Sequence, residues 1–221
     1  MIEAVLWDMD GVLIDSEPLN DEHLEGLLRS WGVSVSAREL EQLRGQSTPA
    51  LATFLTERYG ISKTPEEIIL EERASYYDFL VARRERLIPT PGSAELVSSL
   101  HAEGFSSALV SSASPKRVEL FLDCLGLRPY FKVVVDGDCV PQGRGKPMPD
   151  IYLFASQMLN VPPQRCMGVE DSTHGITAVK SAGMWCVGYA GLPHNKQDLS
   201  GADLVISHFN EINSRLIRQH F

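Results

Sequence analysis

Two aspartates, Asp8 and Asp10, stand in a stretch that begins at Trp7 and follows a short apolar run, Ala4-Val5-Leu6. The run predicts a buried strand, and Gly11 after the acids indicates that the strand gives way to a turn. Residues i and i+2 of a regular strand point to the same side. The two carboxylates would then crowd together, and a cation or a shared proton must offset their repulsion. This pattern favours a metal site with nucleophilic or acid-base chemistry, and a solvated Asp-Gly turn is the simpler alternative.

Further reactive side chains stand where the sequence predicts the ends of other elements: Ser111, Ser112 and Ser114 after a strand, Lys146 before a helix, and Glu170-Asp171-Ser172 after a strand. Carboxylate oxygens are ligands that Mg²⁺ prefers. A lysine and a hydroxyl added to such a metal make a set suited to a phosphoryl group. Singly, Lys146 is typical of a surface lysine and Glu170-Asp171 of a helix N-terminus. The prediction therefore depends on their joint occurrence.

Short apolar strands alternate with helices after the segment Pro89-Thr90-Pro91-Gly92. Strands are expected at 107–110, 132–135, 166–169, 185–187 and 204–206, and helices at 93–102, from 115, at 149–159 and at 172–182. This alternation predicts a parallel sheet covered on both faces. Ligands of such folds bind at the carboxyl ends of the strands, which is where the candidate residues stand.

Residues 16–86 carry helical periodicity instead. Helices are expected up to about Gly32, from a Ser36/Glu39 capping box to about residue 45, at 51–59, and from Thr64-Pro65 toward Arg83. The predicted fold class is therefore α/β, a doubly wound, Rossmann-like parallel sheet with an all-helical cap inserted after the first strand. The predicted domains are a core of residues 1–15 and 89–221 and a cap of residues 16–88.

The composition is that of a globular protein: of 221 residues, 43% are hydrophobic and 22% are charged. The formal charge of −9 argues against a nucleic-acid binder. The N-terminus has no signal-peptide pattern, and no apolar run approaches the roughly 18 residues of a membrane span. We expect a cytoplasmic protein with neither a nucleic-acid nor a membrane partner. The four cysteines are expected to be small buried hydrophobes, and the oligomeric state is not predicted.

Four separated motifs, in order, make the chain resemble the haloacid dehalogenase superfamily. Within it, the chain is most similar to phosphatases with a small helical cap, the sugar-phosphatase and β-phosphoglucomutase-like subgroup. The motifs are Asp8 to Pro18, Ser112, Lys146 in Gly-Lys-Pro-Met-Pro-Asp, and Glu170-Asp171-Ser172 with Gly175.

The resemblance implies that Asp8 attacks phosphorus and forms an aspartyl-phosphate. Asp10 would protonate the leaving oxygen and then accept a proton from the hydrolytic water. The implied cofactor is Mg²⁺, bound by the carboxylates of Asp8 and Asp171 and the backbone carbonyl of Asp10, with Glu170 nearby or acting through water.

The resemblance also implies a cradle for the phosphoryl group and a set of residues that select the substrate. Lys146, Ser112 and the backbone N–H groups around Met9, Asp10 and Ala113 would bind the phosphoryl oxygens. The helical insertion would act as a lid, and its candidate contacts with the substrate are Glu17, Asn20, Gln46 and Thr48.

The expected function is Mg²⁺-dependent hydrolysis of a small phosphomonoester, such as a sugar or polyol phosphate. A β-phosphoglucomutase-type mutase is an alternative, although Asn20 and Thr48 stand where that pattern has a histidine and an arginine. A non-enzymatic alternative is a receiver-like, phospho-accepting signalling module. Such a module would keep its acyl-phosphate, whereas an acid-base carboxylate at Asp10 would speed its loss.

Overall fold

The computed structural model describes residues 1–36, 39 and 48–220, apart from the side chains of residues 48–50 and 220. The chain divides into two compact units, Met1–Asp15 with Leu87–Phe221, called the core unit, and Ser16–Arg86, called the helical unit. The second boundary thus lies after Arg86, slightly before the position given by the sequence. Each unit has its own hydrophobic cluster.

A six-stranded, all-parallel sheet in the order β3-β2-β1-β4-β5-β6 forms the core unit. The strands are β1 (Ala4–Trp7), β2 (Ser106–Val110), β3 (Val133–Val135), β4 (Cys166–Glu170), β5 (Trp185–Tyr189) and β6 (Leu204–Ile206). This arrangement confirms the predicted doubly wound sheet. The strand order reverses between the neighbours β1 and β4, and such a switch point is where ligands of open α/β sheets bind.

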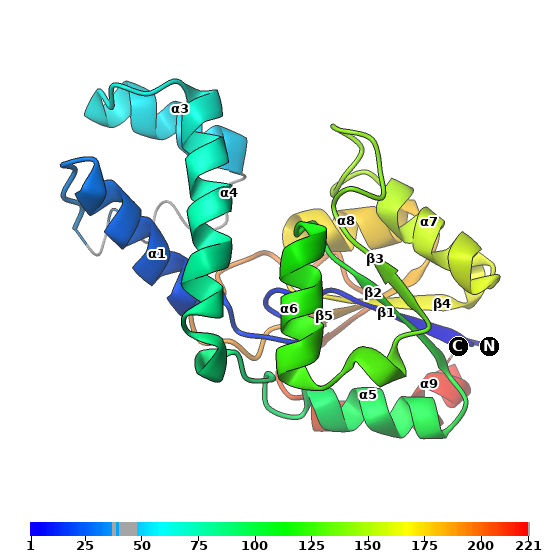
Figure 1. Ribbon diagram of the computed structural model, residues 1–221. Coiled ribbons are helices and arrows are strands. Elements are labelled where there is room, and N and C mark those ends of the chain that lie inside the picture. Colours follow the sequence, from blue (N-terminus) through cyan, green and yellow to red (C-terminus); the bar gives the residue numbers. More distant parts are fainter. Residues whose placement is uncertain (37–38, 40–47, 221) are drawn as a thin grey trace. The chain divides into compact units, whose positions relative to one another are not determined.

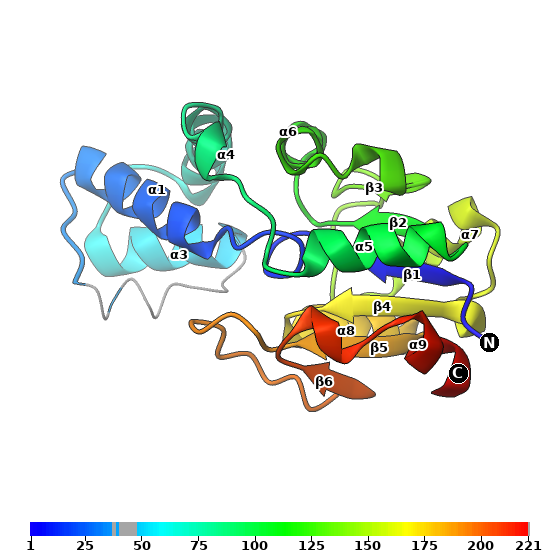
Figure 2. The same cartoon turned by 90° about the horizontal axis from the view of Figure 1, so that it is seen from below.

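Helices cover both faces of the sheet, which explains why the residues of β1 are buried (Figure 2). The helices of the core unit are α5 (Ser93–Ala102), α6 (Pro115–Leu125), α7 (Asp150–Leu159), α8 (Thr173–Ser181) and α9 (Ser214–His220), with short 3₁₀ turns at Arg128–Tyr130, Pro163–Arg165 and Phe209–Glu211. Apolar residues of α7 and α8 form one cluster with Ala4 and Leu6 of β1. Helix α9 was not predicted from the sequence.

The helical unit contains α1 (Glu17–Ser30), α3 (Thr48–Tyr59) and α4 (Pro65–Val81), followed by a 3₁₀ turn at Arg84–Arg86 (Figure 1). Helix α4 begins as predicted, because Thr64 and Glu67 form a capping box. Ser36 and Glu39 make the expected capping contacts. The helix predicted from there to about residue 45 lies outside the described residues.

The strand and helix ends differ from the predictions by up to three residues, and one difference affects the candidate residues. Strand β4 continues to Glu170, whereas the sequence placed its end at Val169. Alternation along β4 puts Glu170 on the same face of the sheet as Cys166, which belongs to the buried cluster under α7 and α8. Asp171 follows the strand. The two adjacent acids therefore have different surroundings.

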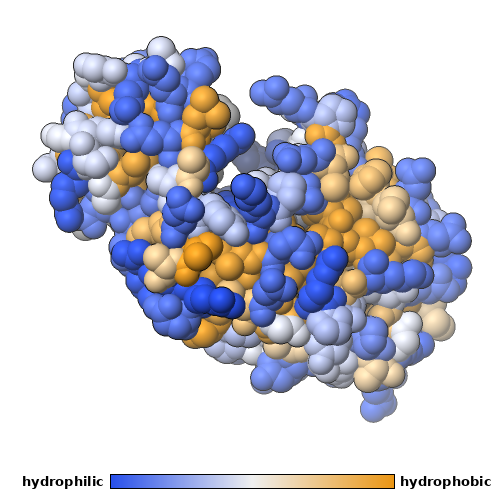
Figure 3. Space-filling model, viewed as in Figure 1, coloured by the Kyte–Doolittle hydropathy of each residue, from blue (hydrophilic) through white to orange (hydrophobic). Residues whose placement is uncertain are grey.

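The surface and the cysteines add little that bears on function. Apolar residues lie among hydrophilic ones on the visible face of each unit (Figure 3). Among the described helices, none is long and apolar enough to cross a bilayer. Cys166 and Cys186 are buried as expected, whereas Cys124 and Cys139 are only partly buried.

Candidate active site

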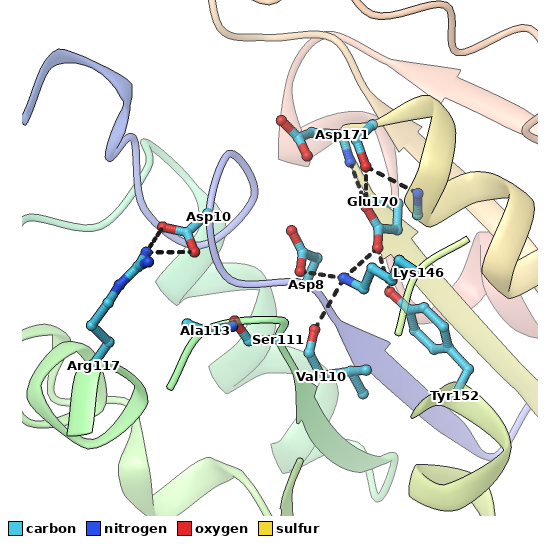
Figure 4. A network of polar contacts seen from close by, with 12 residues as sticks. Asp8, Asp10, Val110, Ser111, Ala113, Arg117, Lys146, Tyr152, Glu170 and Asp171 are labelled. Carbon is cyan, nitrogen blue, oxygen red and sulfur yellow. Dashed lines mark hydrogen bonds and ion pairs between the residues drawn. The ribbon is translucent and has the colours of Figure 1, made fainter. Parts of the chain in front are cut away.

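The carboxyl ends of β1 and β4 bring the first and last candidate motifs together (Figure 4). Asp8 follows β1 directly, and its backbone N–H donates to the carbonyl of Val169 in β4 over 3.0 Å. The side chain of Asp8 is buried. A carboxylate buried at a sheet switch point needs specific partners, because desolvation without pairing is costly.

Lys146 is the direct partner of Asp8 and comes from the loop between β3 and α7. Its Nζ lies 2.5 Å from Oδ1 of Asp8 and 2.6 Å from Oε1 of Glu170. It also donates to the carbonyl of Val110, at the end of β2, over 3.3 Å. One buried ammonium group therefore joins three neighbouring strand ends.

Glu170 has protein partners on both of its oxygens. Oε1 accepts a 2.6 Å hydrogen bond from the hydroxyl of Tyr152 and contacts Lys146, and Oε2 accepts from the N–H of Asp171 and the hydroxyl of Ser172, each at 3.3 Å. A Cβ on Gly175 would lie 1.9 Å from Oε2, so this carboxylate requires glycine in the first turn of α8. Tyr152 was not predicted as a site residue, because an apolar helix face gives no signal of a buried hydroxyl contact.

Asp171 is held from two sides. Asn195, in the loop after β5, donates to its backbone carbonyl over 2.8 Å and to Oδ2 over 3.3 Å. A Cβ on Gly11 would lie 1.9 Å from Oδ2, and Gly11 has φ = +80°. Glycine is thus required at position 11 both for its backbone conformation and for space. Asn195 was also missed, since its loop has no motif.

The chemistry of the three acids suits a cation site. One oxygen from each of Asp8, Glu170 and Asp171 lies within 4.8 Å of the others. An all-oxygen carboxylate set suits a hard divalent cation such as Mg²⁺. Among the residues that the structure describes, three carboxylates face one ammonium group, that of Lys146, so these charges balance only with a further cation or a bound proton.

The pKa shifts reflect this imbalance. Burial raises the pKa of Asp8 to about 7, the charge of Glu170 adds to the increase, and Lys146 opposes it. Burial, Asp8 and Glu170 likewise raise the pKa of Asp171. Burial alone lowers the pKa of Lys146, but its two carboxylate partners outweigh burial and raise it. Lys146 therefore stays charged, while Asp8 and Asp171 resist ionisation.

Asp10 has a separate cationic partner, Arg117 of α6. Nη2 of Arg117 lies 3.0 Å from both carboxylate oxygens of Asp10. Figure 4 shows Asp10 turned toward Arg117 and Asp8 turned toward Lys146. The expectation that the two carboxylates crowd together is wrong. Strand β1 ends at Trp7, before both aspartates, so the rule that residues i and i+2 of a strand point to the same side does not apply to them. Arg117 was not predicted as a site residue. The sequence feature that could have indicated it is a basic side chain near the start of a helix.

In the serine-rich loop after β2, residues 111–114, one group that was expected to bind the phosphoryl group already has a partner in the protein. The N–H of Ala113, expected to bind a phosphoryl oxygen, donates to Oγ of Ser111 over 3.0 Å. Ser112 is exposed, and a Cβ on Gly137 would lie 2.5 Å from its carbonyl oxygen. Met9 is buried, and its carbonyl accepts from Leu13 and Ile14 as the chain turns.

Of the four candidate residues of the helical unit, the structure describes the side chains of two, Glu17 and Asn20. Asn20 accepts a hydrogen bond from the hydroxyl of Tyr76 within this unit, which gives its amide a structural role. Glu17 is the partly buried first residue of α1. Thr48 begins α3, but its side chain is not described, and Gln46 lies outside the described residues.

Comparisons with known proteins identify relatives along nearly the whole chain. A family model described as haloacid dehalogenase-like hydrolase matches residues 2–183. The protein CbbY of Cereibacter sphaeroides is 33% identical over 96% of this chain and 94% of its own length. A phosphorylated carbohydrates phosphatase of Thermotoga maritima is 33% identical over 83% and 82% of the two chains. A solved structure of a CbbY variant from Rhodobacter sphaeroides in complex with xylulose-(1,5)bisphosphate has a TM-score of 0.82, 27% identity and 96% coverage of both chains.

We predict that Gly11→Ala weakens Mg²⁺ binding by about 10- to 100-fold, because the new methyl group must displace the carboxylate of Asp171. Gly143→Ala is the matched control, since Gly143 also has φ = +80° but nothing within 4 Å of its added Cβ. The control should lose about 1–2 kcal/mol of stability and keep its Mg²⁺ affinity. Titration calorimetry measures both affinities, and equal affinities of the two variants would contradict the prediction.

We predict that Mg²⁺ raises the melting temperature more at about pH 8 than at about pH 5. Without metal, ionised Asp8 is less favourable in the folded state, so stability falls as the pH rises from 3.8 to about 7. The cation binds the ionised acids and adds about 2.7 kcal/mol at about 100 times its Kd. Thermal melts at both pH values measure the difference. Equal stabilisation by Mg²⁺ at the two pH values would show that the acids with a raised pKa, Asp8 and Asp171, do not bind the metal.

Proposed function

The chain belongs to the haloacid dehalogenase-like hydrolase family, and we propose that it is a Mg²⁺-dependent phosphatase of small phosphomonoesters that acts through a phosphorylated Asp8. The observation that carries this proposal is the buried contact of Asp8 with Lys146, next to two further acids. A carboxylate nucleophile and a phosphoryl group are both anionic, so a fixed cation between strand ends lowers their repulsion. A hydrolase family also favours an enzyme over a signalling module.

Lys146 would hold the Asp8 carboxylate and offset charge on the phosphoryl oxygens. Its position is fixed, because Glu170 and the Val110 carbonyl bind the same Nζ. Phosphoryl transfer depends mainly on positioning and charge neutralisation. In the first step an oxygen of Asp8 bonds to phosphorus while the bond to the leaving oxygen breaks, and Asp10 supplies the proton to that oxygen. In the second step a water bonds to phosphorus, Asp10 accepts its proton and Asp8 is released.

The carboxylates of Asp8 and Asp171 and the backbone carbonyl of Asp10 would hold Mg²⁺. The bound cation supplies positive charge that orients the phosphoryl group and stabilises its developing charge. Glu170 would act differently, because its two oxygens already contact Lys146 and protein donors. Glu170 would therefore hold Lys146 in place and would contact the cation through water.

The phosphoryl oxygens would contact the hydroxyl of the exposed Ser112 and backbone N–H groups after β1 and β2. The loop that carries Ser112 is fixed, because the N–H of Gly137 donates to the carbonyl of Ala113 over 2.8 Å. The N–H of Ala113 becomes available only if it leaves Oγ of Ser111. The N–H groups of Met9 and Asp10 are the other proposed backbone donors.

The substrate class proposed is a small phosphorylated metabolite, such as a sugar or polyol phosphate. One relative is named for phosphorylated carbohydrates, and the structure of another contains xylulose-(1,5)bisphosphate. A screen of phosphorylated metabolites that measures released inorganic phosphate tests the class. Formation of an isomeric sugar phosphate without release of phosphate would instead indicate a mutase.

We predict that Asp8→Asn lowers phosphatase turnover by at least about 1,000-fold, as loss of a nucleophile does in other enzymes. The amide cannot bond to phosphorus, so turnover should be lost. It has the shape of the carboxyl group, so the melting temperature without metal should be kept. Asp138→Asn, at an exposed position outside the site, is the control. Retained turnover in Asp8→Asn would refute the nucleophilic role.

We predict that Asp10→Asn slows release of phosphate from Asp8 more than its formation from p-nitrophenyl phosphate. The nitrophenolate leaves without a proton, whereas attack by water still requires a base. Rapid mixing should therefore show a burst of about one nitrophenol per enzyme, followed by slow turnover. Equal slowing of both steps would argue against the double role of Asp10.

A further inference from the structure

The contact between Asp10 and Arg117 is not explained by any role assigned so far. Arg117 lies in the first turn of α6, after the N-cap residue Ser114 and Pro115. One nitrogen, Nη2, lies 3.0 Å from each oxygen of the Asp10 carboxylate. Both residues are partly buried. The contact joins the loop after β1 to the helix after β2, so it depends on the fold.

The position of Arg117 is unfavourable for helix α6 itself. The first turn of a helix favours acids, because its free N–H groups carry partial positive charge. Helix α6 has no acid in its first turn, and Lys116 and Arg117 stand there instead. The carboxylate of Asp10 supplies the missing negative charge from another element. A residue that opposes its local structure and is compensated at a distance is typical of a functional site.

The guanidinium group is held on its other side as well. Its Cζ lies 5.6 Å from the ring centroid of Phe121, one helical turn further along α6. Phe121 is fully buried. The guanidinium group therefore lies within cation–π range of the buried Phe121 ring as well as against Asp10, and the two contacts restrict its orientation. A fixed donor can orient a carboxylate better than a mobile one.

We propose that Arg117 is a positioning residue that holds the Asp10 carboxylate in the orientation from which it exchanges protons with the leaving oxygen and with water. This inference rests on the proposed function. Arg117 exchanges no proton itself. Because Nη2 reaches both oxygens of Asp10, one oxygen still accepts from Arg117 when the other carries the proton. The same contact therefore serves both steps of the reaction.

Substrates with different leaving groups distinguish a positioning role of Arg117 from direct binding of the phosphoryl group. The kcat/KM reports the steps up to formation of phosphorylated Asp8. An alkyl phosphate must have its leaving oxygen protonated in these steps, whereas p-nitrophenyl phosphate does not need the proton. Arg117→Ala should lower kcat/KM by about 10-fold or more for the alkyl phosphate and by less than about 3-fold for the nitrophenyl ester.

Three further variants sharpen the test. Arg117→Lys keeps the charge with a single ammonium group and should recover part of the loss. Lys116→Ala removes the neighbouring cation of the same turn and should leave both kcat/KM values unchanged. In an Asp10→Asn background, Arg117→Ala should cause no further loss of kcat/KM with the alkyl phosphate, because the residue acts through Asp10. Melting temperatures check that the variants are folded.

Other results would overturn the inference. An equal loss with both esters, expressed as a higher KM, would mean that Arg117 binds the phosphoryl group directly. An unchanged or faster reaction of Arg117→Ala with the alkyl phosphate would mean that the contact is structural or inhibitory. The failure of the proposed function is distinguishable, since the unmodified protein would then hydrolyse neither ester.

Discussion

The ammonium group of Lys146 between the carboxylates of Asp8 and Glu170 is the interaction on which the rest of the site depends. At 2.5 and 2.6 Å from the two acids, it ties together strand ends that are distant in the sequence. It also leaves the cluster short of positive charge, because Asp171 adds a third carboxylate. Burial makes this shortage costly and raises the pKa of Asp8 and Asp171. A bound divalent cation would meet that electrostatic requirement.

The sheet topology makes this concentration of charge possible. β1 and β4 are neighbours at the point where the strand order reverses, so Asp8 and Glu170 leave adjacent strands at the same edge. Glycines then allow the close approach that the acids need. Gly11 gives room to Asp171, and Gly175 gives room to Glu170. Packing and electrostatics therefore constrain the same few positions.

The two aspartates of the first motif are separated by their cations. Asp8 faces Lys146 and Asp10 faces Arg117, on different sides of the loop after β1 (Figure 4). Each carboxylate therefore has its own cationic partner, and the two side chains point in different directions. The division between Lys146 and Arg117 thus fits the two roles proposed for these acids.

The sequence alone determined the fold class and most of the candidate residues. Strand and helix periods are local properties, so the alternation after residue 89 predicted the parallel sheet, and Thr64 and Glu67 predicted the start of α4. Only the tertiary structure decided the partners: Arg117 for Asp10, Tyr152 for Glu170 and Asn195 for Asp171. It also decided that Ala113 donates to Ser111. Hydrogen bonds between elements depend on register and on side-chain direction at the strand ends, which no local pattern encodes.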